Sequence, residues 1–86
     1  MHTIELLEQG LDLIRRLGYQ VRNEWLDGAA GGGCELAGRK VFFLDLALPA
    51  GDQLDQVLDT LRREPEALQL PMPHTLRELL QVRRSA

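Results

Sequence analysis

The residues that could perform chemistry are few and lie far apart in the chain. Cys34 is the single cysteine, and the two histidines, His2 and His74, lie near the two ends. A cysteine nucleophile needs an adjacent base that helps to form its thiolate, and neither histidine lies in a structured motif. We therefore interpret Cys34 as a small apolar residue that packs on a sheet, and we expect no catalytic residue and no enzymatic activity.

Metal and hydrolytic sites are not expected either. A zinc site needs three or four His, Cys or acidic ligands at close spacing, and this chain has two distant histidines and one cysteine. Glu35 and Asp45 could act as paired hydrolytic carboxylates. The strand pattern described below places them on opposite faces of a sheet, where they could not act on one substrate. We predict no metal site and no cofactor.

The glycine-rich stretch from Asp27 to Gly33 could present backbone N–H groups to an anion. It does not match a phosphate-binding loop, because no Lys-Ser or Lys-Thr follows it and a strand is predicted where a helix should begin. We favour a wide or bulged connection between two strands. The alternative is a backbone loop that approaches a ligand or a partner.

The residues after these glycines predict a β-hairpin. Val41 to Leu46 is a short run of β-branched and aromatic residues, which is typical of a strand. Gly38-Arg39 fits a two-residue type II′ loop, which would pair Leu36 with Val41. One face of the hairpin would then carry Cys34, Leu36, Val41 and Phe43, and the other would carry Glu35, Phe42, Leu44 and Leu46.

The residues from Tyr19 to Leu26 alternate between apolar and polar side chains. This pattern predicts a half-buried antiparallel strand with one face in water. Trp25 falls in the inward set, so we interpret it as a core residue, with a tryptophan at a binding surface as the alternative.

Apolar residues at helical spacing predict helices before and after the strands. Thr3, Asp52 and Thr75 are the predicted N-caps of these helices. The stripes consist of Ile4, Leu7, Leu11, Ile14 and Leu17, then Leu54, Val57, Leu58 and Leu61, and finally Leu76, Leu79 and Leu80. We predict one α+β domain over residues 1–86, a three-stranded antiparallel β-meander packed with helices in the order α-β-β-β-α-α.

Composition limits the classes of function. A hydrophobic content of 44% argues against disorder, and a net charge of −3 argues against a general nucleic-acid binder. The pairs Arg62-Arg63 and Arg83-Arg84 are expected near helix ends, where arginine is favoured. The chain shows neither a signal peptide nor about 20 successive apolar residues, and its one cysteine forms no internal disulfide. We therefore expect a cytoplasmic protein without membrane contact.

Part of the chain resembles short bacterial proteins of unknown function. The matching pattern is Leu17-Gly18-Tyr19, then Gly32-Gly33-Cys34, then Gly38 to Asp45, within roughly residues 11–64. This resemblance implies no activity. The hairpin and the helix after it are also similar to a segment of repressor-cleaving zinc metallopeptidases, whose helix carries His-Glu-x-x-His. The helix predicted here from Asp52 to Glu64 contains no histidine, so zinc chemistry is not carried over.

These observations favour a small non-catalytic interaction module that forms a homodimer. A three-stranded sheet has two edges, and exposed edges invite pairing. The segment Leu70-Pro71-Met72-Pro73 is apolar for an exposed connection, so Trp25, Leu70 and Met72 are the candidate partner surface. One alternative is an enzyme or ligand-binding protein with a site at the glycine loop and Cys34. Another is a nucleic-acid accessory domain that uses the C-terminal arginines.

Overall fold

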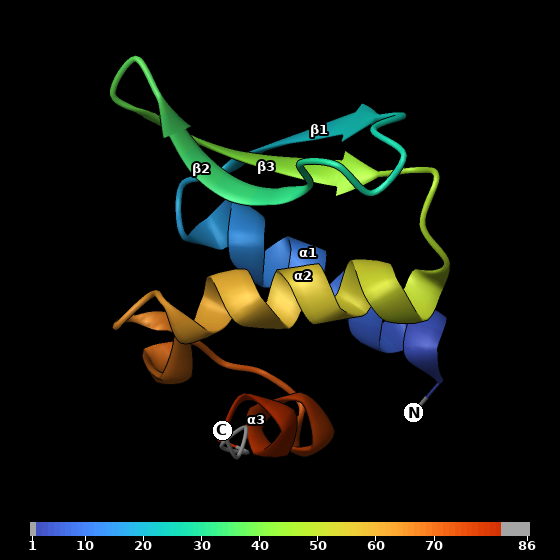
Figure 1. Ribbon diagram of the computed structural model, residues 1–86. Helices are drawn as coiled ribbons and strands as arrows, with labels where there is room; N and C mark the ends of the chain where they lie inside the picture. Colours follow the sequence, from blue (N-terminus) through green and yellow to red (C-terminus); the bar gives the residue numbers. More distant parts are fainter. Residues whose placement is uncertain (1, 82–86) are drawn as a thin grey trace.

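A computed structural model describes residues 2–81 as a sheet covered on one face by helices (Figure 1). The elements are α1 (Thr3–Arg16), β1 (Gln20–Glu24), β2 (Gly32–Leu36), β3 (Arg39–Asp45), α2 (Ala50–Arg62), a short 3-10 helix η1 (Ala67–Gln69) and α3 (His74–Gln81). The sheet forms one layer, α1 and α2 form the second, and α3 lies on the far side of α2. The predicted α+β class is confirmed, and η1 is an addition to the predicted order.

The sheet is mixed, so the predicted antiparallel meander is wrong. The strand order is β1-β3-β2; β1 runs parallel to β3, and β2 runs antiparallel to it. The chain therefore crosses from one outer strand to the other before it returns to the centre. The seven residues between β1 and β2, rich in glycine and alanine, are long enough for this crossing, whereas a meander would need a tight turn there.

The hairpin loop is Ala37-Gly38, one residue earlier than the predicted Gly38-Arg39. Both loop residues have positive φ, 52° and 78°, as a type I′ turn requires. Leu36 therefore pairs with Arg39 and not with Val41, and Cys34 pairs with Val41. This shift moves each partner by two positions, and an even shift leaves every side chain on its predicted face.

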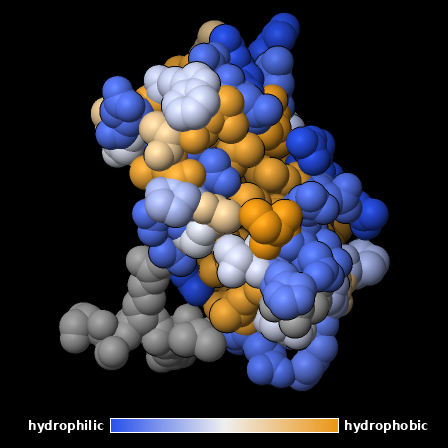
Figure 2. Space-filling model, turned by 90° about the vertical axis from the view of Figure 1, so that its right-hand side faces the viewer, coloured by the Kyte–Doolittle hydropathy of each residue, from blue (hydrophilic) through white to orange (hydrophobic). Residues whose placement is uncertain are grey.

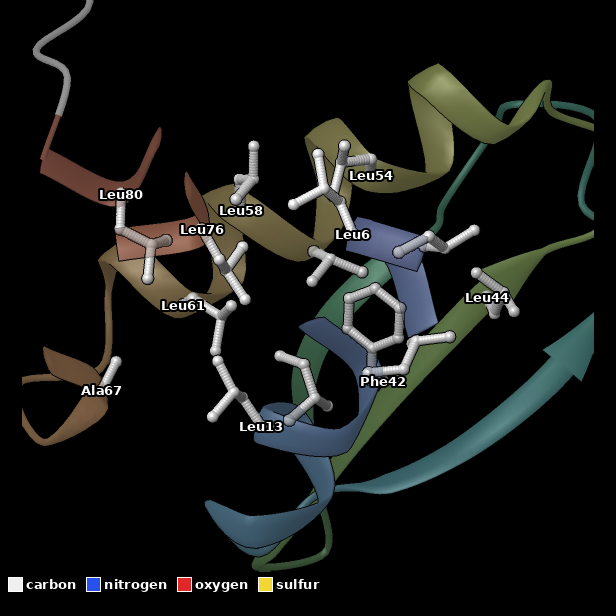
Figure 3. Close-up of a cluster of buried hydrophobic side chains, with 14 residues drawn as sticks. Leu6, Leu13, Phe42, Leu44, Leu54, Leu58, Leu61, Ala67, Leu76 and Leu80 are labelled. Carbon is white, nitrogen blue, oxygen red and sulfur yellow. The ribbon is translucent and has the colours of Figure 1, made fainter. Parts of the chain in front are cut away.

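The core lies between the sheet and the helices. Phe42 is fully buried and points from β3 into leucines of α1 and α2 (Figure 3). Gly10 lets these two helices approach closely, because a Cβ atom there would lie 2.6 Å from a methyl group of Val57. Leu76 and Leu80 bring α3 into the same cluster.

The helices begin slightly earlier than their predicted caps. His2 and Pro49 are the N-cap residues of α1 and α2, and α3 starts at His74 instead of after Thr75. Asp52 lies in the first turn of α2, where its charge faces the positive end of the helix. Within residues 2–81, none of the helices has both the length and the apolar character that spanning a membrane requires.

Candidate interaction surface

Within residues 2–81, one face of the sheet carries no helix. Because α1 and α2 lie on the same side (Figure 1), the register places Cys34, Leu36 and Phe43 on the opposite, open face. The interpretation of Cys34 as a packed residue is wrong, since its side chain is exposed. Leu36 is 49% exposed. Apolar and sulfur-containing side chains therefore face solvent at the β2 side of the sheet.

Charged side chains of β1 cover part of the open face. The guanidinium of Arg22 lies 5.8 Å from the centre of the Phe43 ring, a cation–π arrangement. The same guanidinium lies 3.3 Å from Glu24 Oε1. Both charges are largely exposed, so this ion pair contributes little to folding. Its members remain available to a partner.

Trp25 does not belong to the core, which corrects the sequence-based interpretation. Its side chain is 72% exposed, directly after the end of β1. The chain stops following the strand here, because Leu26 turns back toward β3 and Asp27 and Gly28 adopt positive φ. The alternation from Tyr19 onward therefore ends before it reaches Trp25, which is left at the surface.

Asp45 causes this change of direction. Its carboxylate, fully buried at the end of β3, accepts hydrogen bonds from the backbone N–H groups of Leu26 (3.0 Å), Gly28 (2.6 Å) and Ala47 (2.9 Å). Burial acts to raise the pKa of Asp45, but the three N–H donors outweigh it and hold this pKa below its ordinary value. Asp45 thus fixes the β1–β2 connection, with both oxygens used.

A second polar cluster joins the start of β1 to the end of α2. The Tyr19 hydroxyl donates a 2.7 Å hydrogen bond to Glu64, and Lys40 Nζ lies 3.4 Å from the same carboxylate. Burial and then the hydrogen bond to Glu64 raise the pKa of Tyr19 to about 12. The phenol therefore remains a neutral donor at physiological pH and anchors the entry to β1.

The outer edge of β2 is partly occupied by α2. A two-residue loop makes Leu36–Arg39 a hydrogen-bonded pair, and the pattern alternates along the ladder. Gly33 and Glu35 therefore direct their backbone groups away from β3. The Gly33 N–H donates to the Thr60 hydroxyl at 3.1 Å, and Thr60 is buried. This edge is consequently closed to another strand at its Gly33 end.

The outer edge of β1 is open. The C=O of Glu24 accepts from the Leu46 N–H on the β3 side at 2.8 Å. In a parallel ladder alternate residues face the neighbouring strand, so Val21 and Asn23 direct their backbone groups outward. Among residues 2–81 no further backbone partner lies across this edge. Asn23 is also exposed, so the edge can receive another strand.

The end of the sheet beside Trp25 has a hydrophobic surface. Figure 2 views the molecule from the side where β1 and β3 end and α2 begins, and hydrophobic side chains gather across the upper and central part of this face. Polar side chains surround them. The end of β1, which Trp25 directly follows, therefore lies on a face with exposed hydrophobic surface suited to contact.

Leu70 and Met72 lie elsewhere. Both are half-buried against the core, in the segment between η1 and α3 beneath α2 (Figure 1). This segment is held by Arg77, whose guanidinium donates to the carbonyls of Leu68 (2.7 Å) and Leu70 (3.2 Å). A hollow of about 350 Å³ separates Pro71–Pro73 from α1. The structure therefore does not bring Leu70 and Met72 together with Trp25.

The glycine loop borders a small polar hollow of about 220 Å³. Its lining consists of Gly31, Gly32, Gln56, Asp59, Thr60 and Arg63. The buried Oε1 atom of Gln56 has no hydrogen-bond partner among the described residues. Cys34, which the alternative site at the glycine loop would use, does not line this hollow.

Arg62 has a structural position, and the described residues hold no cluster of metal ligands. Arg62 donates to the Leu79 carbonyl at 2.8 Å and contacts Asp59 at 3.2 Å, so it joins α2 to α3. Arg83 and Arg84 lie outside the described residues. Within residues 2–81, no three His, Cys, Asp or Glu side chains gather in a way that could hold a metal ion.

No protein-family model matches the chain, and neither curated proteins nor solved structures give a significant match. The geometry of the described residues is therefore the basis for a functional proposal. Its main features are the open edge of β1, the exposed Trp25 and the edge of β2 that Thr60 closes at its Gly33 end.

Proposed function

We propose that this protein is a non-catalytic interaction module that forms a homodimer through the open edge of β1. The observation that carries the proposal is the difference between the two outer strands. Thr60 occupies the edge of β2, whereas Val21 and Asn23 present outward backbone groups on β1. Unpaired strand edges recruit further strands through main-chain hydrogen bonds.

Trp25 supports the same surface. It lies at the end of this edge and is 72% exposed. Tryptophan is enriched among the residues that dominate binding energy at interfaces, because it buries a large rigid area. A partner strand along β1 would reach this side chain and remove it from water.

The dimer is expected to be weak. β1 has five residues, and pairing two such strands buries less than the total of about 1,600 Å² found in standard interfaces. Dissociation constants near the micromolar range are typical of such small contacts. The association should therefore be followed over a wide concentration range.

A proline at the open edge tests this proposal. Asn23→Pro removes one outward N–H while sparing the bonds to β3, so it should abolish the dimer and leave the fold intact. Glu35→Pro is the matched control, because the Glu35 N–H also points outward but belongs to β2. Sedimentation velocity from about 5 to 500 µM measures the dimer, and circular dichroism checks the fold.

Three outcomes would count against the proposal. The wild-type chain could remain monomeric at every concentration, Asn23→Pro could dimerise normally, or Glu35→Pro could be the variant that loses the dimer. The last result would move the interface to β2.

A second candidate function is the binding of a small polar ligand in the hollow beside the glycine loop. The unpartnered Gln56 Oε1 and the nearby Arg63 favour it. Gly31→Ala would crowd this hollow, because a Cβ atom there would lie 2.7 Å from Gln56 Nε2. NMR titration with a panel of small polar metabolites should shift resonances of Gly31 and Gly32 in the wild type and not in this variant. Gly51→Ala, in open space, is the control.

A further inference from the structure

We propose that two copies pair their β1 strands antiparallel, with Asn23 opposite Asn23 of the partner subunit. This inference rests on the proposed homodimer and specifies its register. It follows from the direction of the backbone groups on β1 and from the order of its charges.

The backbone restricts the possible registers. The backbone N–H and C=O groups of Val21 and Asn23 point away from β3. Those of Gln20, Arg22 and Glu24 form hydrogen bonds to β3. In an antiparallel pair, a residue whose backbone groups point toward the partner strand must lie opposite a residue whose backbone groups point back toward it, because the two exchange hydrogen bonds. A two-fold dimer satisfies this condition with its axis at any of the five residues of β1. An axis at Gln20 pairs Gln20 alone with its counterpart and leaves the rest of the strand unpaired.

The charges distinguish the other four registers. An axis at Arg22 would place two arginines opposite each other, and an axis at Glu24 would do the same with two glutamates, which is unfavourable. An axis at Val21 leaves Arg22 opposite Gln20 of the partner subunit. The axis at Asn23 places Arg22 opposite Glu24 of the partner subunit, and by symmetry Glu24 opposite Arg22 of the partner subunit.

The same register uses Trp25. It places Trp25 opposite Val21 of the partner subunit, a half-buried residue that packs against the core. The exposed indole would then extend the hydrophobic contact at each end of the paired strands. Aromatic and β-branched cross-strand neighbours are favourable, so backbone, charge and hydrophobic contacts agree on one arrangement.

The resulting assembly closes on itself. The two sheets would join into one with the order β2-β3-β1-β1-β3-β2, and β2 would lie at both outer edges. Thr60 occupies part of that edge in each copy. Addition of a third copy is therefore hindered, and the assembly is a dimer and not a filament.

A charge-reversal cycle tests the register. Arg22→Glu or Glu24→Arg puts like charges opposite each other at both ends of the pair, so each should weaken the dimer by about tenfold or more. The double variant Arg22→Glu with Glu24→Arg restores opposite charges and should recover most of this loss. If the double variant dimerises no better than the single variants, the Asn23 register is wrong. Circular dichroism of all three variants excludes unfolding as the cause.

Cross-linking gives an independent measurement. In a Cys34→Ser background, Asn23→Cys places two thiols at the symmetry axis, where the Cα atoms of a hydrogen-bonded pair lie about 5.5 Å apart, within disulfide range. Val21→Cys places its thiols four positions out of register. Mild oxidation should therefore cross-link the first variant and not the second, and the reverse result would establish the Val21 axis.

These measurements separate two kinds of failure. A wild-type chain that stays monomeric overturns both the homodimer and its register. A dimer that is lost in Asn23→Pro, but shows neither charge recovery nor an Asn23→Cys cross-link, overturns the register and leaves the homodimer in place.

Discussion

Asp45 shows how one side chain decides the path of the backbone. Its carboxylate lies at the end of the central strand and holds the chain as it passes from β1 to β2. A buried carboxylate would be costly without partners, and here three N–H groups supply them. Asp45, one of the two carboxylates considered as a hydrolytic pair, therefore has a structural role in the β1–β2 connection.

Replacing Asp45 should destabilise the fold in a pH-dependent way. Asp45→Asn replaces one accepting oxygen by an NH2 group, which cannot accept from the surrounding N–H groups, and it removes the negative charge. The Tm at pH 7 should fall by roughly 5–10 °C. Because the folded pKa lies below the ordinary value of 3.8, the contribution of Asp45 is present above that pH and is lost as the pH falls through the folded pKa. The difference in Tm between wild type and variant should thus shrink below pH 3.8.

Thermal unfolding measured between pH 2 and pH 7, the range that brackets an aspartate titration, gives this comparison. Asp55→Asn, at an exposed position on α2, is the control and should behave as the wild type does. A difference in Tm that stays constant down to the lowest pH would contradict the role given to the Asp45 charge.

Single-residue features were the least predictable from the sequence. The alternation from Tyr19 correctly indicated a strand, but it could not show that the chain turns at Leu26, because the cause lies 19 positions away at Asp45. Trp25 was consequently assigned to the core and is exposed. Cys34 was assigned to a packed position for a separate reason, its place on a sheet, and is also exposed. The sequence held one weak signal for this turn. An aspartate at the end of a strand can accept hydrogen bonds from the N–H groups of a glycine-rich connection, and Asp45 and the residues after Trp25 fit that description.

At the scale of elements, α2 and β2 fit together at one narrow contact. A Cβ atom at Gly33 would lie 2.6 Å from Thr60 Cγ2, so glycine allows the strand to approach the helix. The Thr60 hydroxyl also donates to the Gln56 carbonyl at 3.0 Å, which orients it to accept from Gly33. Helix α2 thereby protects the edge of the strand beside it.

Thr60→Val should remove this protection. The valine keeps the shape of threonine but leaves the Gly33 N–H without its acceptor, at a cost of about 1 kcal/mol in the free energy of unfolding. The open edge should also permit species larger than a dimer. Urea unfolding and sedimentation measure the two effects, and Thr60→Ser, which retains the hydroxyl, is the control. Equal behaviour of the two variants would show that the hydroxyl does not guard the edge.

The elements themselves were largely predictable, because each depends on local periodicity. The helical stripes placed α1, α2 and α3, and the hairpin faces were correct. The loop position was wrong by one residue, since Gly38 suits both the type II′ turn that was predicted and the type I′ turn that forms. Only the second turn places Ala37 at positive φ, which few sequence rules favour for alanine.

At the scale of the whole molecule, the strand order was the main error. Adjacent strands in the sequence usually pair, and a meander is the simplest arrangement of three. Here the central position belongs to β3, whose Val41 and Phe42 are buried on opposite faces. A strand with apolar side chains on both faces gains most from a strand on each side of it. The apolar residues on both faces of this strand were visible in the sequence before any topology was assigned.

The parallel pairing of β1 with β3 has a consequence for the order of folding. Gln20 pairs with Val41 and Glu24 with Asp45, so each pair joins residues 21 positions apart, whereas the β2–β3 hairpin closes over a two-residue loop. Distant contacts form more slowly than local ones. We expect the hairpin to assemble early and β1 to dock late, so the strand proposed to receive a second molecule is also the last to join its own sheet.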